Sequence, residues 1–267
     1  MNPWLALLAP FAACWHAWVL ALGRTPGLDE ALPLLLVGGA LAARWITHRA
    51  KLQRVPAWPL TILLMAYFAA VLFLPPLLRI LPATLAVAYC MHAAATGPAA
   101  ANLGARGAPP ASLFGLVALA LPVVDSFEFY FAYPVRLIAL QATLTLLRMN
   151  GVAVEAEGLG LRFAGDLVEF DAPCSGVRML WTCWFLASAL SYLYRFTFGR
   201  YALALLFSTL IALASNVLRA TSLFYLETGL LGPAWPEWLH DGVGIAAFCI
   251  TALVLCWSLT TARARPS

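Results

Sequence analysis

A cysteine stands at the point where a polar loop meets a long apolar run. The loop ends with Asp171-Ala-Pro-Cys-Ser-Gly-Val-Arg178, and the apolar run extends to Tyr194. Pro173 suits the entry to a helix, because its missing N–H is not needed there. Cys174 would then lie near the positive end of the helix dipole, with Arg178 four residues later on the same helical face. Both effects favour a thiolate over a thiol, so the stretch predicts a reactive cysteine.

Two later apolar runs carry polar residues that could act together with this cysteine. Asn216 and Arg219 lie three residues apart in the run 201–226, and therefore on one helical face. His240 and Asp241 open the last run. An ionisable side chain at the centre of a membrane costs on the order of 2.5–3.5 kcal/mol, which by default indicates function. The alternatives are an Arg219 that extends to the membrane interface and a structural His240.

A thiolate, an imidazole and a guanidinium together can perform acyl transfer through a thioester. Cys174 would be the nucleophile, and His240 would exchange protons near neutral pH. Arg219 could hold the thiolate, orient the substrate carbonyl or stabilise the oxyanion. Asp241 could orient the imidazole, as carboxylates do in catalytic triads. Ser175 is a weaker candidate nucleophile, because no Gly-x-Ser-x-Gly motif surrounds it.

Other charged residues lie upstream of the cysteine. The acidic ones are candidates for a supporting role or ordinary solvated positions, and the arginines are predicted to anchor lipid headgroups. These residues are Asp125, Glu128, Glu169 and Asp171, and Arg136 and Arg148.

The composition places these residues in a membrane protein. Of the 267 residues, 63% are hydrophobic and 10% are charged. A soluble domain has about 45–50% apolar and about 25% charged residues. The net charge of +4 bears on membrane orientation and gives no reason to expect nucleic-acid binding.

The other five cysteines lie inside apolar runs and are predicted to be small buried hydrophobic residues. No pair has metal-ligand spacing or a loop setting typical of a disulfide, so we expect neither a metal nor another cofactor. They are Cys14, Cys90, Cys183, Cys249 and Cys256.

Eight apolar runs are candidate membrane spans within one domain, residues 1–267. The first lacks a basic leader and a cleavage site, so we expect a membrane helix there and no signal peptide. The runs are 4–22, 31–47, 58–74, 77–95, 111–124, 177–194, 201–226 and 241–260.

Residues 134–149 form an ambiguous run of 16 residues. If it spanned the membrane, Arg195 and Arg200 would lie opposite the basic cluster 48–54, against the preference for cytoplasmic positive charge. As an interfacial amphipathic helix it leaves residues 125–173 outside the cytoplasm, in one extracytoplasmic segment. Cys174, Arg219 and His240 then lie at one depth on the outer face, although they belong to three different spans. We therefore expect one site.

Residues 150–170 are predicted to form a short β-hairpin that leads to the cysteine. Asn150-Gly151 is a hairpin-type turn, and apolar and polar residues partly alternate in 152–157 and 159–170. The fold class expected is all-α polytopic membrane protein. It has about eight transmembrane helices, an extracytoplasmic amphipathic helix and this hairpin.

Three motifs in order resemble the exosortase/archaeosortase family of membrane cysteine transpeptidases. They are Ala172-Pro-Cys-Ser-Gly-Val-Arg178, Asn216-Val-Leu-Arg219 and His240-Asp-Gly-Val-Gly244, and the similarity covers about residues 121–244. The upstream Tyr133-Pro-Val-Arg-Leu-Ile-Ala-Leu-Gln141 also resembles the segment before the family's cysteine. Pro173 directly before the cysteine and the lack of an added C-terminal domain indicate a divergent stand-alone subtype.

The resemblance implies removal of a C-terminal sorting signal from exported proteins. Such tails consist of a short motif, a membrane helix and a basic cluster; the product passes through a thioester to an acceptor. The resemblance makes Cys174 the nucleophile, Arg219 the essential arginine and His240 the proton-transfer residue. A histidine at this position also implies a bacterial inner membrane. The motif recognised and the acceptor stay open.

A different function class is also compatible with the residues. A polytopic transporter or assembly factor for an exported polysaccharide could use Arg219 and His240 to line a substrate path. That class predicts that replacing Cys174 is tolerated.

Overall fold

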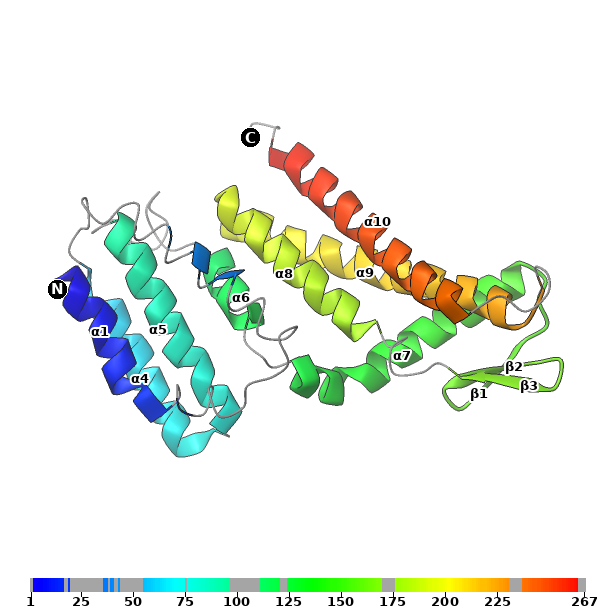
Figure 1. Ribbon diagram of the computed structural model, residues 1–267, viewed down its shortest axis with the longest axis horizontal. Coiled ribbons are helices and arrows are strands. Elements are labelled where there is room, and N and C mark those ends of the chain that lie inside the picture. Colours follow the sequence, from blue (N-terminus) through cyan, green and yellow to red (C-terminus); the bar gives the residue numbers. More distant parts are fainter. Residues whose placement is uncertain are drawn as a thin grey trace. The chain divides into compact units, whose positions relative to one another are not determined.

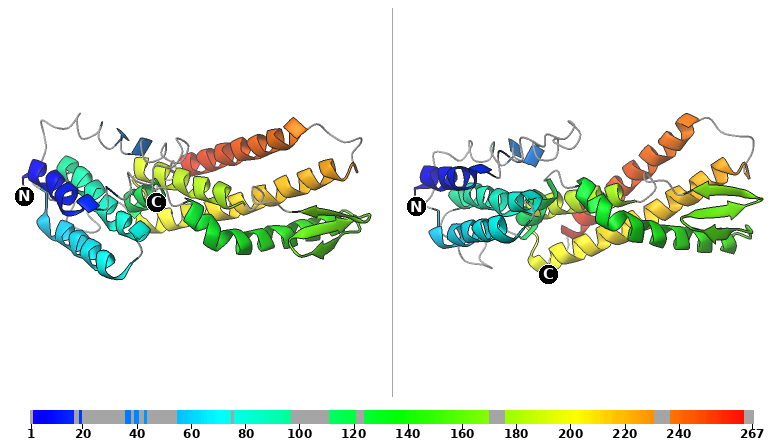
Figure 2. Two further views of the ribbon diagram at one scale, coloured as in Figure 1. Left: turned by 60° about the horizontal axis from the view of Figure 1, so that its bottom comes forward. Right: turned by 90° about the horizontal axis from the view of Figure 1, so that it is seen from below.

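The computed structural model shows helices and one small sheet (Figures 1 and 2). It describes residues 2–16, 19, 36–37, 39–40, 43, 55–74, 76–96, 111–120, 124–169, 176–230 and 237–263. For some of these only the backbone is described, among them Asp125, Glu169, His240 and Asp241. The predicted basic cluster 48–54 and most of the predicted span 31–47 lie outside the described residues.

The chain divides into two compact units, and each is treated by itself. The first comprises Met1–Val123 with Arg195–Phe198, and the second comprises Val124–Tyr194 with Gly199–Ser267. The described helices of the first unit are α1 (Pro3–Ala13), α4 (Ala57–Phe73), α5 (Pro76–Thr96) and α6 (Ala111–Ala120).

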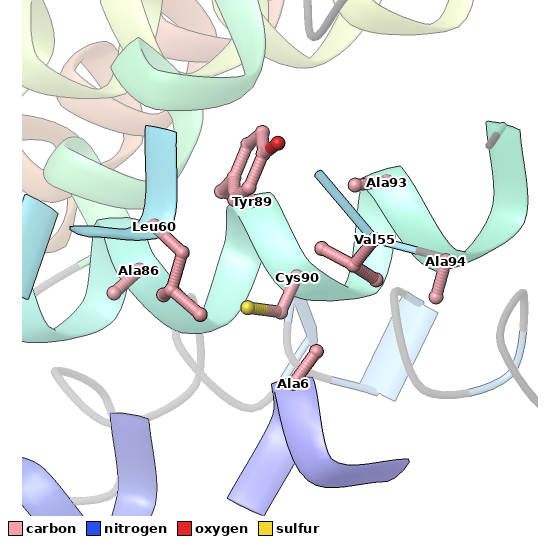
Figure 3. Packing of buried hydrophobic residues seen from close by; sticks show 8 residues of the cluster. All are labelled: Ala6, Val55, Leu60, Ala86, Tyr89, Cys90, Ala93 and Ala94. Atoms are coloured by element: carbon pink, nitrogen blue, oxygen red, sulfur yellow. The ribbon is translucent and has the colours of Figure 1, made fainter. Parts of the chain in front are cut away.

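Small side chains let the helices of the first unit approach closely. Ala6 of α1 lies beside Cys90 of α5, and Leu60 of α4 completes the contact (Figure 3). Tyr89 is almost fully buried, and its hydroxyl donates to the Pro56 carbonyl at 3.2 Å. Close packing of small residues is typical of helix contacts in membranes, where apolar burial from water adds little.

The second unit holds the residues expected to do chemistry. Its helices are α7 (Val124–Met149), α8 (Val177–Leu193), α9 (Phe198–Glu227) and α10 (Glu237–Arg263). The predicted start of α7 at residue 134 was wrong: Pro134 lies inside a helix of 26 residues. The helix tolerates a proline there, although it loses one backbone hydrogen bond.

The apolar helices make the chain a polytopic all-α membrane protein, as predicted. By length and composition, Glu128–Met149, Phe198–Glu227 and Gly242–Thr261 could each cross a membrane, and Ala57–Phe73, Leu78–Ala94 and Ala111–Ala120 are shorter apolar helices. These are the candidates among the described residues. The interfacial placement of α7 stays a prediction.

The predicted β structure is present with one more strand than expected. The predicted hairpin turn at Asn150-Gly151 was wrong, because these residues close the end of α7, where the Val152 N–H donates to the Leu147 carbonyl at 3.1 Å. Strands β1 (Glu155–Glu157), β2 (Gly160–Phe163) and β3 (Asp166–Glu169) form an antiparallel sheet in the order β1-β2-β3. The run predicted as one strand breaks at Ala164 and Gly165, where φ is 52° and 99°. Two consecutive positive φ angles match a type I′ hairpin turn.

The sheet lies against the C-terminal half of α7 (Figures 1 and 2). Leu161 of β2 is fully buried in a cluster with Leu140 of α7 and Phe224 of α9. Arg148, predicted to anchor a headgroup, instead donates from Nε and Nη2 to the Val154 carbonyl, both at 3.2 Å. This bond fixes the path of the chain from α7 into β1.

Candidate active site

The start of α8 lies directly against the middle of α9. Gly176 is the N-cap of α8, with φ of 74°, and its carbonyl accepts from the Leu180 N–H at 2.9 Å. A Cβ at Gly176 would lie 2.6 Å from Asn216 Nδ2 and 2.7 Å from its Cγ. Asn216 is 1% exposed, so it cannot move away into solvent. The backbone angle and the close amide therefore both require glycine.

This contact constrains the predicted nucleophile through the covalent chain. Cys174, with Asp171 and Ser175, lies outside the described residues. It precedes Gly176 by two residues, and two trans peptide units span at most about 7 Å between Cα atoms. Asn216 therefore lies beside a residue that is only two positions from Cys174 in the chain.

Arg219 is packed against α10. A Cβ at Gly244 would lie 3.4 Å from both Nε and Nη2 of Arg219, an ordinary van der Waals distance, so the guanidinium lies directly beside this turn of α10. Two turns further along α10, the Thr251 hydroxyl donates to Ser215 Oγ of α9 at 2.6 Å, which is a second contact between the two helices. Residue 240 lies on α10 one helical turn before Gly244, on the same helical face.

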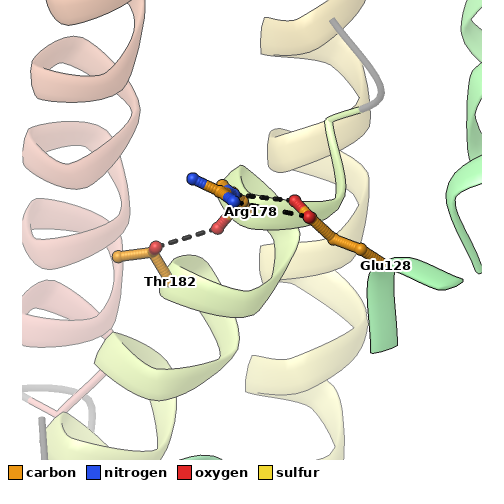
Figure 4. A network of polar contacts seen from close by, with 3 residues as sticks. All are labelled: Glu128, Arg178 and Thr182. Carbon is orange, nitrogen blue, oxygen red and sulfur yellow. Dashed lines mark hydrogen bonds and ion pairs between the residues drawn. The ribbon is translucent and has the colours of Figure 1, made fainter. Parts of the chain in front are cut away.

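Arg178 lies in an ion pair that the sequence did not predict. Its Nε donates to Glu128 Oε1 of α7 at 2.7 Å, and its Nη2 to Oε2 at 3.5 Å (Figure 4). The Arg178 side chain is 71% exposed and that of Glu128 is 26% exposed. Because Glu128 matches its charge, Arg178 contributes less positive potential at the cysteine than its sequence position suggested. The pair instead ties α7 to the first turn of α8.

The structure brings some of the predicted site residues together and does not describe the side chains of others. Asn216, Arg219 and Arg178 come within one region of the second unit through their contacts with Gly176, Gly244 and Glu128. The side chains of His240 and Asp241 are not described. The sequence left the role of Glu128 open. It also did not predict that Gly176 contacts Asn216 or that Gly244 contacts Arg219, although both glycines stand within the motifs.

Five of the six cysteines belong to the part of the chain that the structure describes. Among these, Cys14, Cys90 and Cys183 are buried free thiols, as expected; Cys249 is exposed and Cys256 is partly buried, which corrects that expectation for helix α10. The described part of the chain contains no group of His, Cys, Asp and Glu residues that could hold a metal ion.

Comparison with known proteins gives one result that covers most of the chain. Residues 24–257 match the family described as transmembrane exosortase (Exosortase_EpsH). No curated protein and no solved structure gives a match. The match includes all three motifs that meet in the second unit. The chain belongs to the transmembrane exosortase (Exosortase_EpsH) family.

Proposed function

We propose that the chain is a cysteine peptidase and transpeptidase that removes a C-terminal sorting signal from exported proteins. The observation that carries the proposal is a pair of contacts, Gly176 on Asn216 and Gly244 on Arg219. They join three segments that are far apart in sequence, those beginning at Cys174, Asn216 and His240. Membership of the exosortase family supports the same class of activity.

The proposed reaction proceeds through a thioester. The thiolate of Cys174 attacks the carbonyl carbon of the scissile peptide bond, and Arg219 stabilises the negative charge that develops on the carbonyl oxygen. His240 donates a proton to the departing nitrogen as the C–N bond breaks. An acceptor nucleophile then attacks the thioester, loses its proton to His240 and releases the thiolate.

The proposed place of action is the outer face of a bacterial inner membrane. The distribution of arginines along the apolar runs supports this side. Substrates would be exported proteins whose tail combines a short motif, a membrane helix and a basic cluster. The acceptor is a nucleophile of a surface component or water.

The proposal is tested by replacing Cys174 with Ala in a host that carries a reporter protein with such a tail. Tail removal should stop. Cys249→Ala is the matched control, because it removes an exposed thiol from α10 and should leave tail removal intact. Normal tail removal by Cys174→Ala would overturn the proposal and favour a transporter or assembly factor.

A further inference from the structure

A pair of hydroxyl groups joins α9 to α10 at a buried position. The Thr251 hydroxyl of α10 lies 2.6 Å from Ser215 Oγ of α9 and 2.6 Å from the Ala247 carbonyl, and it can donate to either oxygen. The Ser215 hydroxyl donates to the same carbonyl at 3.4 Å. Thr251 is 2% exposed. Ser215 therefore contacts two successive turns of α10.

This arrangement differs from the common way in which a helix satisfies a hydroxyl. Thr221 of α9 and Thr261 of α10 each donate to the carbonyl four residues earlier in their own helix. The Ala247 carbonyl can satisfy the Thr251 hydroxyl in the same way without any group from α9. The contact between Thr251 and Ser215 is thus an addition that acts between the two helices.

The sequence of α10 allows this contact in one register. The face that carries Thr251 continues through Leu255 and Leu259, which are 0% and 5% exposed. One turn to either side of Thr251, this face carries Ala247 and Leu255, whose side chains have no hydroxyl. A slide of α10 by one turn would place Ser215 opposite an apolar side chain. Buried polar contacts between helices can specify register even where they add little stability.

The same two helix faces carry residues that are proposed to perform the chemistry. Ser215 and Arg219 are four residues apart on α9 and share a face. Positions 240, 244, 247 and 251 of α10 follow the helical repeat and also share a face. The Arg219 guanidinium lies beside Gly244 on that face. Thr251 is about 16 Å along the helix axis from position 240, so a slide of α10 at Thr251 moves the backbone of the histidine by the same distance.

We propose that Ser215 and Thr251 are positioning residues that set the depth of α10 against α9 and thereby align His240 with Arg219. The inference rests on the proposed function, which supplies the roles of His240 and Arg219. Both of these groups act on one peptide bond, so their alignment determines the rate of the chemical step. Neither hydroxyl is assigned a contact with the substrate, and substrate affinity should not depend on them.

The first test measures kcat and KM for cleavage of a tailed reporter protein, together with the melting temperature. Thr251→Val keeps the shape of the side chain and removes its hydroxyl. The kcat should fall about 10- to 100-fold, because a shift of about 1 Å at a reacting group can cost about 100-fold in rate. The KM should hardly change. Thr251→Ser keeps the hydroxyl and should restore most of kcat. Thr261→Val is the matched control on α10, because the exposed Thr261 hydroxyl bonds carbonyls of its own helix.

The second test uses an independent variant on α9. Ser215→Ala deletes one oxygen from a partly buried position, so it can be measured even if Thr251→Val does not fold. It should lower kcat as Thr251→Val does. The double variant should cost little more than either single variant, since the same contact is lost in each. Ser222→Ala is the matched control, because the exposed Ser222 hydroxyl bonds the Leu218 carbonyl of its own helix.

Three results would overturn the inference. An unchanged kcat in Thr251→Val and Ser215→Ala, even with a lower melting temperature, would reduce the contact to helix packing. A rise in KM as the main effect would indicate a role in substrate binding. Losses of kcat that multiply in the double variant would show that the two hydroxyls act separately. Failure of the proposed function is a different result, because it appears as tail removal by Cys174→Ala.

Discussion

Replacing Gly176 with alanine tests how the start of α8 is positioned. Alanine is strained at a φ of 74°, and its Cβ would lie 2.6 Å from Asn216 Nδ2. The obstacle is a short side chain that is 1% exposed, so the substitution must displace α8 or α9. Since Cys174 is two residues away, the same displacement should move the thiol.

The two costs can be separated by a control with only one of them. Gly151 has φ of 79°, but nothing lies within 4 Å of a Cβ there. Left-handed backbone costs about 1–2 kcal/mol for alanine, and both variants pay this penalty. Overpacking adds about 1–3 kcal/mol in Gly176→Ala alone. For a chain of this size, 1 kcal/mol corresponds to about 2–4 °C in Tm, so Gly176→Ala should melt several degrees below Gly151→Ala.

The assay combines thermal unfolding in detergent with the rate of reporter cleavage. A shift of about 1 Å at a reacting group can cost about 100-fold in rate, so Gly176→Ala should be nearly inactive at temperatures where it is folded. Gly151→Ala should keep its activity. In an Asn216→Ala background the clashing Nδ2 and Cγ are gone, so the added melting penalty of Gly176→Ala should shrink.

The reasoning is refuted if Gly176→Ala matches Gly151→Ala in both melting temperature and cleavage rate. It is also refuted if the penalty of Gly176→Ala persists in full without the Asn216 amide. In either case the contact would not position the cysteine segment.

Three further predictions concern the same unit. Glu128→Gln removes an ion pair whose arginine is 71% exposed, so the free energy of unfolding should change by less than about 1 kcal/mol. Cleavage should be slower than in wild type at low salt, and the two rates should converge at high salt, which screens the ion pair in wild type. A loss of rate that does not depend on salt would contradict this. Gly244→Ala places a Cβ 3.4 Å from the Arg219 guanidinium. Helix propensity favours alanine by up to about 1 kcal/mol, so the melting temperature should stay the same or rise while kcat/KM falls. A fall in both the melting temperature and kcat/KM would contradict this prediction. The hydrogen bond from Arg162 lowers the pKa of Glu157; its stabilisation is present above the ordinary glutamate pKa and is lost as the pH falls through the lowered one. Hydrogen exchange in the sheet should therefore distinguish Glu157→Gln from wild type at neutral pH and not at about pH 2, and an equal difference at both pH values would exclude this role.

Most helices could be predicted from the sequence because an apolar run in a membrane has few alternatives to a helix. The boundary of α7 could not, since Pro134 is a common helix start and nothing local shows that the helix continues through it. The third strand was missed because Ala164–Gly165 lacks the Asn-Gly or Asp-Gly signature of a type I′ turn. Burial of Leu161 in the sheet's contact with α7 and α9 helps to fix that fold.

In the candidate site, the helical faces of some residues could be predicted from the sequence, whereas their contacts could not. Asn216 and Arg219 could be identified because their helical spacing puts them on one face. The partner of Arg178 could not, because Glu128 is 50 residues away and nothing in the sequence couples them. Burial of the Arg136 Nε also depends on which face of α7 packs inward, which only the tertiary structure shows.

The central claim is that Cys174 carries the substrate as a thioester. The direct measurement is mass spectrometry of enzyme that has been mixed with a tailed reporter protein and quenched in acid. The peptide containing Cys174 should carry the N-terminal product, neutral hydroxylamine should release it, and Arg219→Ala should greatly reduce its formation. The exposed thiol of Cys249 serves as an internal control and should stay unmodified. Tail removal without an adduct on Cys174, or an adduct on Cys249 instead, would contradict the account.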